Sequence, residues 1–209
     1  MKVVVFGASG RTGREVVRQA LARGFNVTAV VRQTARLPLA HLNLRVVAGD
    51  ITDARAVARV ISGQTGVIST LGVGTPLQHD PSVIDGVRTI ARAAKHASIA
   101  RLIYLSFIGV RESRAAAGVV LARLAATLLR HETKDHEIKE AAVAESLVDW
   151  TIVRPPKLTN GRLTASYRAG EDIRAPTPLP LMSRADVADF MLQQLTDRTF
   201  IRKVVCILH

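Results

Sequence analysis

The stretch that decides the fold is Gly7-Ala8-Ser9-Gly10-Arg11-Thr12-Gly13, which follows the apolar run Lys2–Phe6 and opens an amphipathic pattern over Arg11–Arg23. A glycine loop between a buried strand and a helix is the context that a dinucleotide-binding loop requires. Gly7 permits the tight turn, Gly10 lets the backbone approach a pyrophosphate, and Gly13 allows close packing of helix on strand. Ser9, Arg11 and Thr12 stand beside the free N–H groups of the helix start, which favour phosphate.

Strand and helix patterns alternate through the first half of the chain. The expected strands are Lys2–Phe6, Asn26–Val31, Leu44–Val47, Gly66–Leu71 and Arg101–Phe107. The expected helices are Arg11–Arg23, a segment capped by Thr52 or Asp53 that runs to about Ile61, and Ser82–His96. Strands separated by helices of this length predict an α/β fold of Rossmann type, with a doubly wound, mostly parallel sheet and right-handed crossovers.

The second half is expected to continue the same sheet. The patterns predict helices at Ala115–Leu129, at Lys134–Ser146 and from Ser183 or Arg184 to about Leu195, strands at Asp149–Val153 and Lys203–Leu208, a hairpin over Arg162–Arg174, and a loop at Pro176–Pro180. Nothing resembles a linker between domains, so we expect one domain over 1–209, with small substrate-side elements within about 110–180.

Composition excludes several classes of protein. The formal charge is +12, but no basic run exceeds two residues and no aromatics are interleaved, so nucleic acid is not the expected partner. No run approaches the roughly 18 apolar residues that span a bilayer, which predicts no membrane segment. Cys206 is the one cysteine, so neither an internal disulfide nor a cysteine metal site can form. These features favour a cytoplasmic protein.

The end of the second strand distinguishes NADP from NAD. An acidic residue there binds the ribose 2′-hydroxyl, whereas arginine accommodates a 2′-phosphate. This strand ends at Arg32, Arg36 follows four residues later, and no carboxylate occurs between Glu15 and Asp50. The sequence therefore predicts NADP(H); the alternative interpretation of Arg32 is a solvated strand end.

Two further pairs of residues complete the predicted cofactor site. Asp50 and Ile51 close the third strand and are placed to contact the adenine, although Asp50 could instead serve only as a helix cap. Leu71 and Gly72 follow the fourth strand and would line the path to the nicotinamide.

The chain resembles the atypical short-chain dehydrogenases/reductases, and among them the family of NADPH-dependent flavin reductase/biliverdin reductase B, with NmrA-like proteins as a wider circle. The motifs that carry the resemblance are the glycine loop, Val31-Arg32, Arg36-Leu37-Pro38, Gly49-Asp50-Ile51, Leu105-Ser106-Phe107, Asp135-His136, Trp150 through Pro156, Leu163 through Tyr167, and Arg184–Leu195. The resemblance runs nearly end to end.

That resemblance implies a monomer that uses NADPH to reduce flavins and some tetrapyrroles at an open site above the nicotinamide. It places the family's serine at Ser106, at the end of the fifth strand. A family histidine would fall at Lys157, and this departure removes any histidine-dependent proton delivery from that position. Lys157 could attract an anionic substrate, donate a proton, or be a surface lysine; Ser106 could simply close its strand.

Short-chain dehydrogenases with a Tyr-x-x-x-Lys pair use the lysine to lower the pKa of the tyrosine. Here the corresponding slot holds Asp135 and Lys139. Lys139 could hold the nicotinamide ribose, or it could be an exposed lysine that pairs with Asp135. The six histidines show no ligand spacing, so no metal site is expected. His131 and His136 could lie near the mouth of the active site, but they are interpreted as residues of a solvated helix.

The missing tyrosine disfavours alcohol–ketone interconversion but permits hydride transfer to acceptors that delocalise charge. The first hypothesis is an NADPH-dependent reductase of a flavin-, quinone- or tetrapyrrole-like acceptor. The alternative is an NmrA-like protein that binds NADP(H) and regulates a partner without turnover. An epimerase or isomerase is disfavoured by the missing tyrosine and the lack of a sugar-binding domain.

Overall fold

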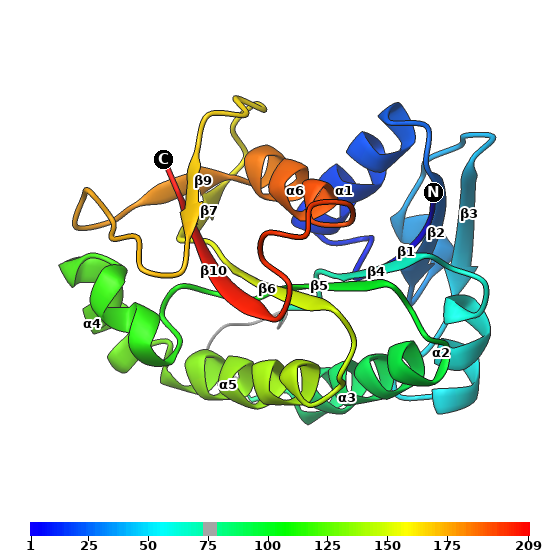
Figure 1. Cartoon of the computed structure of the whole chain (residues 1–209), viewed down its shortest axis with the longest axis horizontal. Helices are drawn as coiled ribbons and strands as arrows, with labels where there is room; N and C mark the ends of the chain where they lie inside the picture. Colours follow the sequence, from blue (N-terminus) through cyan, green and yellow to red (C-terminus); the bar gives the residue numbers. More distant parts are fainter. Residues whose placement is uncertain (73–78) are drawn as a thin grey trace.

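The computed structural model describes residues 1–72 and 79–209 (Figure 1). Its strands are β1 Lys2–Phe6, β2 Asn26–Val31, β3 Leu44–Ala48, β4 Gly66–Ser69, β5 Arg101–Leu105, β6 Trp150–Arg154, β7 Lys157–Thr159, β8 Arg168–Gly170, β9 Leu181–Ser183 and β10 Lys203–Leu208. Its helices are α1 Arg11–Ala22, α2 Ala54–Ile61, α3 Pro81–His96, α4 Val119–Ala126, α5 Arg130–Ala144 and α6 Arg184–Gln193, with 3-10 turns η1 Thr34–Arg36 and η2 Arg111–Ala116.

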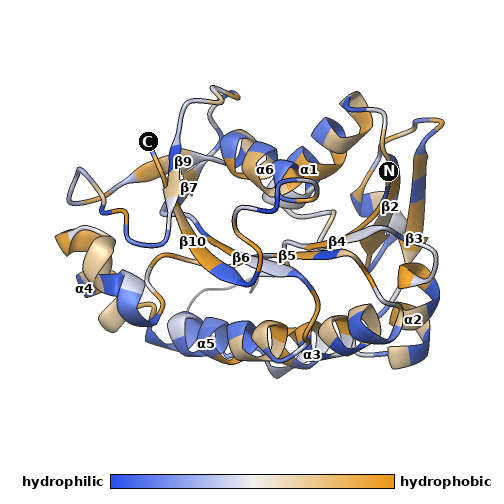
Figure 2. Cartoon of the chain, viewed as in Figure 1, coloured by the Kyte–Doolittle hydropathy of each residue, from blue (hydrophilic) through white to orange (hydrophobic). Residues whose placement is uncertain are grey.

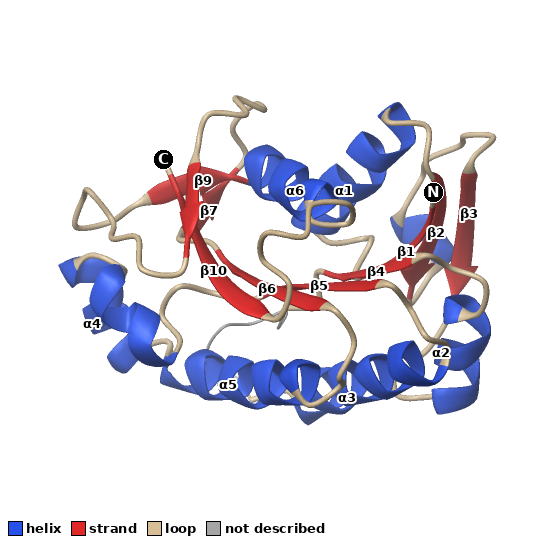
Figure 3. Cartoon of the chain, in the orientation of Figure 1, coloured by secondary structure: helices blue, strands red, loops and turns tan. Residues whose placement is uncertain are grey.

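The main sheet has the order β3-β2-β1-β4-β5-β6-β10-β8, and all its neighbours pair in parallel except β8, which runs antiparallel to β10. Helices cover both faces: α1 and α6 lie on one side, and α2, α3 and α5 lie on the other (Figures 1 and 3). This arrangement confirms the predicted doubly wound Rossmann architecture.

The apolar runs of the central strands are buried because helices cover both faces of the sheet. Val3 and Val5 of β1 point into the cluster beneath α1 and α6, whereas Val4 and Phe6 point into the cluster beneath α2, α3 and α5. All four side chains are fully buried, and Figure 2 shows the apolar residues concentrated along the strands. This burial on both faces holds β1 in the centre of the sheet, and the loop that follows β1 therefore starts from a fixed position at the carboxyl end of that strand.

The predicted helix Ala115–Leu129 is wrong, because the segment is divided into η2 and α4. Gly118 separates the two with φ of +83°, and a Cβ atom there would lie 2.4 Å from the carbonyl oxygen of Thr177. The chain therefore turns between two short helical pieces, where propensity alone favours one continuous helix. The helix expected at Lys134–Ser146 is α5, which begins earlier, at Arg130.

The predicted hairpin over Arg162–Arg174 is also wrong. Within the described residues, β8 pairs with β10 and not with a preceding strand, while β7 pairs in parallel with β9. The buried carboxylate of Asp186 accepts hydrogen bonds from the backbone N–H groups of Thr164 and Ala165, over 2.7 and 2.8 Å. This carboxylate holds the segment as a loop against the start of α6.

Asp53, one of the two predicted caps of α2, is confirmed, and so is the predicted start of α6 at Arg184. The side chain of Asp53 accepts from the backbone N–H groups of Arg55 and Ala56 at the start of α2. Ser183 similarly accepts from Asp186 at the start of α6. Among the described residues, no helix has the length and apolar character needed to cross a bilayer.

Candidate functional site

The glycine loop presents an open helix start at the carboxyl end of β1. Gly10 is the N-cap of α1, and no side chain of the described residues caps the first turn. A Cβ atom at Gly13 would lie 2.1 Å from the carbonyl oxygen of Gly7, so only glycine allows this loop to close against the helix. The uncapped N–H groups, with Arg11 beside them and no acidic residue in the first turn, fit a phosphate group.

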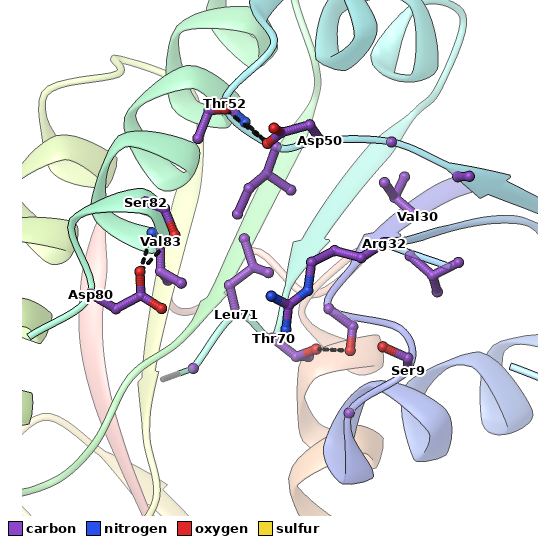
Figure 4. Close-up of a pocket in the computed structure, with 17 residues that line it drawn as sticks. Ser9, Val30, Arg32, Asp50, Thr52, Thr70, Leu71, Asp80, Ser82 and Val83 are labelled. Atoms are coloured by element: carbon purple, nitrogen blue, oxygen red, sulfur yellow. Dashed lines mark hydrogen bonds between the residues drawn. The ribbon is translucent and has the colours of Figure 1, made fainter. Parts of the chain in front are cut away.

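A cavity of about 750 Å³ begins at this loop and extends over the ends of β1, β2, β3 and β4. Its lining includes Gly7, Ser9, Gly10, Arg32, Asp50, Ile51, Thr70, Leu71, Gly72 and Asp80. Figure 4 shows the Arg32 side chain reaching from the end of β2 toward Thr70 and Leu71. The predicted residues Arg32, Asp50 and Ile51 therefore share one cavity with the glycine loop.

Asp50 and Arg36 both make local hydrogen bonds, and of the two only Asp50 lines the cavity. The Asp50 carboxylate accepts from the backbone N–H and hydroxyl of Thr52, over 2.9 and 2.8 Å, and these hydrogen bonds lower its pKa. Arg36 lies on η1, donates to Gln33 over 3.1 Å, and is not among the described residues that line the cavity. The structure thus brings Arg32 to the site but leaves Arg36 outside it.

A second cavity of about 800 Å³ lies on the other side of the glycine loop. The two cavities share Gly10, Thr70, Leu71 and Gly72. The shared wall stands where β1 meets β4, which is where the strand order reverses and where doubly wound sheets bind ligands. An extended dinucleotide can therefore lie with one half in each cavity.

The second cavity gathers residues from distant parts of the chain. Its lining includes Arg11, Thr12, Leu105, Ser106, Phe107, Leu121, Leu124, Leu129, Glu132, His136, Pro155, Pro156, Lys157, Leu158, Leu179 and Arg184. Ser106 and Lys157, the two predicted catalytic residues, thus line the same space. Ser106 is buried, whereas Lys157 is exposed.

A buried polar network lies behind Ser106. Its hydroxyl donates to Glu140 Oε1 over 2.5 Å and lies 3.3 Å from His136 Nδ1. The Tyr104 hydroxyl also contacts His136 Nδ1, at 3.0 Å. Arg154 neutralises the Glu140 carboxylate through two hydrogen bonds, over 2.9 and 2.7 Å. The network connects β5, α5 and β6 at one wall of the second cavity.

The interpretation of His136 as a solvated residue is wrong, since only 4% of it is exposed. Burial, followed by the charges of Lys139 and Arg154, lowers its pKa well below the ordinary histidine value. Burial raises the pKa of Tyr104 well above the ordinary tyrosine value. At neutral pH the imidazole is therefore neutral and the phenol keeps its proton.

The interpretation of Lys139 as an exposed helix lysine is also wrong. Its side chain is fully buried, and its Nζ has no hydrogen-bond partner among the described residues. The expected partner, Asp135, instead contacts His79 Nδ1 at 2.5 Å and accepts from the Asp80 backbone over 3.2 Å. Lys139 does not belong to the described lining of either cavity, so its role toward a ribose stays a prediction.

The sheet order, the glycine loop and the paired cavities define a dinucleotide-binding protein of the Rossmann class. Residues 7–198 match the family model described as NAD(P)H-binding, and the chain belongs to that family. This match confirms the cofactor class that the loop predicts.

One curated relative is the (4-alkanoyl-5-oxo-2,5-dihydrofuran-3-yl)methyl phosphate reductase of Streptomyces griseus subsp. griseus, with 29% identity over 199 residues and 93% of this chain. The chain spans 63% of that relative's length, and 34% and 37% of the next two. Among solved structures, the fold is similar to ChuY, an anaerobillin reductase from Escherichia coli O157:H7, with a TM-score of 0.80, 24% identity and coverage of 100% of this chain and 97% of that chain. It is also similar to a short-chain dehydrogenase/reductase from Veillonella parvula in complex with NADP, with a TM-score of 0.78, 18% identity and coverage of 100% and 94%.

Sequence reasoning missed the site residues Glu132, Glu140, Arg154 and Arg184. A signal for part of this set exists in α5, where Glu132, His136, Lys139 and Glu140 recur at helical spacing. A helix that packs on a sheet ordinarily turns an apolar stripe inward. A polar stripe on a helix is compatible with a site or with solvent, so the sequence marks these residues but does not reveal their burial.

Proposed function

We propose that this chain is an NADPH-dependent reductase that transfers a hydride to a small acceptor with a delocalised carbonyl system, of the flavin, quinone or tetrapyrrole type. The observation that carries this proposal is the shared wall of the two cavities. A cofactor whose adenosine half lies beside Arg32 has its nicotinamide half beside Ser106 and His136, in a cavity with room for a second molecule.

NADPH supplies the hydride when bound, and the chain positions its two ends. The N–H groups of the α1 start and Arg11 would hold the pyrophosphate, while Arg32 would contact the 2′-phosphate. Leu71 and Gly72, between the cavities, would flank the nicotinamide half. Lys157 would draw anionic acceptors toward the open side of the second cavity.

The network determines which nitrogen of His136 carries the proton. The Ser106 hydroxyl donates its hydrogen bond to the Glu140 carboxylate. The Tyr104 hydroxyl, which stays protonated, is therefore the group that can donate a hydrogen bond to His136 Nδ1. With Nδ1 accepting, neutral His136 would carry its hydrogen on Nε2, and this nitrogen would be the one available to donate to a ligand. A neutral imidazole at such a position stabilises a developing oxyanion by hydrogen bonding, and solvent can supply the final proton.

The relative from Streptomyces griseus extends the range of acceptors to test. Its name describes a reductase of an alkanoyl dihydrofuranone that carries a methyl phosphate. A carbon–carbon double bond conjugated to a carbonyl accepts hydride and places the charge on oxygen, which is the charge that His136 would stabilise. We therefore include this class of compound beside flavins, quinones and bilins.

NADPH oxidation is measured at 340 nm with flavin mononucleotide, menadione, biliverdin and an alkanoyl dihydrofuranone methyl phosphate, beside a calorimetric titration of NADPH. Turnover with at least one acceptor supports the reductase. Tight NADPH binding without turnover for any acceptor would overturn it in favour of a regulatory NADP(H)-binding protein.

A further inference from the structure

We infer that the acceptor is amphipathic: an apolar acyl or alkyl chain lies against α4, and an anionic oxygen group such as phosphate lies between Lys157 and Arg184. This inference rests on the proposed function, because it concerns the acceptor of the same site. It adds a substrate class and two opposing subsites within the second cavity.

The apolar subsite is formed by the turn of chain around α4. Leu121, Leu124 and Leu129 line the cavity from this segment, and Phe107 and Leu179 add apolar surface from neighbouring loops. Leu121 is only 3% exposed, so it is a fixed part of the wall. Figure 2 shows mostly apolar residues along α4, which carries few charged groups for a helix at the edge of the molecule. Such a wall accommodates hydrocarbon.

The anionic subsite is formed by cations from two other elements. Lys157 begins β7 and is exposed, and Arg184 begins α6 and is partly buried. One guanidinium nitrogen of Arg184, Nη1, donates to Asn160 Oδ1 over 2.8 Å, which orients the group. Burial lowers the pKa of Arg184, and the nearby charge of Arg11 lowers it further. Arg184 therefore already has one neighbouring cation, Arg11, and shares a cavity lining with a second, Lys157; an anion bound there would reduce the repulsion.

The cofactor does not account for all of these cations. Arg32 lies in the first cavity, where the 2′-phosphate is expected, and the α1 start with Arg11 is placed for the pyrophosphate. Lys157 and Arg184 come from two other elements, β7 and α6. Because Arg184 is near enough to Arg11 to feel its charge, the NADPH affinity of the Arg184 variant is measured separately. The one carboxylate in the described lining is Glu132, whose pKa is raised by burial, so it opposes an anion less than an ordinary glutamate does.

The test uses alkanoyl dihydrofuranone methyl phosphates with hexanoyl and acetyl chains, and the dephosphorylated alcohol of each. Values of kcat/KM are measured for wild type, Arg184→Gln, Lys157→Gln and Leu124→Ser. The matched controls are Arg92→Gln, which removes a cation elsewhere, and Leu128→Ser, which alters an exposed residue outside the described cavity lining. A separate titration measures NADPH affinity for each variant.

Wild type is expected to prefer phosphate over alcohol by about 10- to 100-fold, as one charge-assisted contact supplies. Arg184→Gln should reduce this preference about tenfold, and Lys157→Gln should reduce it less, with an effect that shrinks in salt. Each buried methylene contributes about three- to fourfold, so the four additional methylenes of hexanoyl should raise kcat/KM over that of acetyl by on the order of 100-fold, and Leu124→Ser should lower the ratio of the two values.

Equal kcat/KM for phosphate and alcohol in wild type would overturn the inference while leaving the reductase proposal intact. So would an Arg184→Gln variant that weakens NADPH binding and keeps its phosphate preference, because that result assigns Arg184 to the cofactor. If no acceptor is turned over, the reductase proposal fails. Calorimetry then measures the binding of the hexanoyl dihydrofuranone methyl phosphate and of its dephosphorylated alcohol to NADP+-loaded protein. Equal affinities for the two compounds, or no binding of either, would overturn the inference.

Discussion

Arg154 of β6 and Glu140 of α5 form a two-fold hydrogen-bonded ion pair, with Nε and Nη2 of the arginine donating over 2.9 and 2.7 Å. Both side chains are almost fully buried, at 2% and 5% exposure. Arg154 Nη1 also donates to Glu112 over 2.6 Å, and Ser106 donates to the same Glu140 oxygen as Arg154 Nε. The pair therefore joins the wall of the second cavity to the sheet beneath it.

Removing one partner of this pair should destabilise the fold strongly. Arg154→Met leaves the buried Glu140 carboxylate without its counter-charge, and we expect a loss of about 3–5 kcal/mol in the free energy of unfolding. Urea denaturation measures this loss. The double variant Arg154→Met with Glu140→Leu should recover most of it, because neither charge of this pair remains. A single variant within about 1 kcal/mol of wild type would contradict the buried pair.

Arg32 should decide the preference for NADP(H). Its position in the first cavity predicts that Arg32→Ala weakens NADP(H) at least about tenfold and leaves NAD(H) nearly unchanged, since one charge-assisted contact is worth about 1.5–3 kcal/mol. Calorimetric titration with both cofactors checks this. Arg36→Ala is the matched control, and it should change the ratio of the two affinities far less. Equal wild-type affinities for the two cofactors would refute the assignment.

The neutral imidazole of His136 should contribute to turnover more than to cofactor binding. His136→Ala is expected to lower kcat by about 10- to 100-fold, as the loss of one hydrogen bond to a developing charge predicts. His136→Gln, which keeps an N–H donor, should retain part of the rate. Steady-state kinetics with the best acceptor of the panel gives both values. An unchanged kcat in His136→Ala would remove the imidazole from the mechanism.

Ser106→Ala should lower turnover about tenfold, because Ser106 fixes Glu140 and contacts the His136 ring. Ser113→Ala provides a control, since that buried serine bonds only to the carbonyls of Ile108 and Val110 among the described residues. Equal losses in the two variants would indicate a general effect of hydroxyl removal.

Burial of neutral His136 should also make stability depend on pH. Its folded pKa is depressed, so the unfolded chain binds more protons as the pH falls below about 6.5. The stability associated with the neutral ring is complete above that pH and is lost toward the folded pKa, at up to about 1.4 kcal/mol per pH unit. Urea denaturation from pH 7.5 to 5.5 should show a shallower loss in His136→Gln than in wild type. The exposed His131→Gln serves as control, and a slope in His136→Gln as steep as that of wild type would argue against the effect.

The chain is expected to be a monomer. The outer groove between α3 and α5, of about 500 Å³, is lined by five cations, Arg88, Arg92, Lys95, Arg111 and Lys134, and by two carboxylates, Glu137 and Glu145. Two copies paired across this groove would oppose like charges. Light scattering at low micromolar concentration checks the prediction. A stable dimer would direct attention to α4, where Val119 is 58% exposed and Val120 is 42% exposed.

By itself, the sequence determined the fold class, and it predicted most of the residues that the structure gathers around the first cavity. Gly7, Gly10 and Gly13 are close in sequence, and the short turn that they form depends on local backbone geometry. The alternation of buried strands with helices predicts a parallel sheet with right-handed crossovers, whereas the order of the strands comes from the structure. Arg32, Asp50 and Leu71 each stand at a strand end, so their approach to one cavity follows from the order of the strands.

Only the tertiary structure showed the second cavity and the buried polar network behind it. His136, Lys139 and Glu140 lie on a charged helix, and a charged helix ordinarily faces water. Their burial depends on packing against β5 and β6, where Arg154 and Tyr104 provide partners that no sequence spacing reveals. The same holds at Gly118, whose turn is required by contact with Thr177, far along the chain. Local pattern specifies the backbone path, whereas the environment of a buried charge is set by residues that meet only after folding.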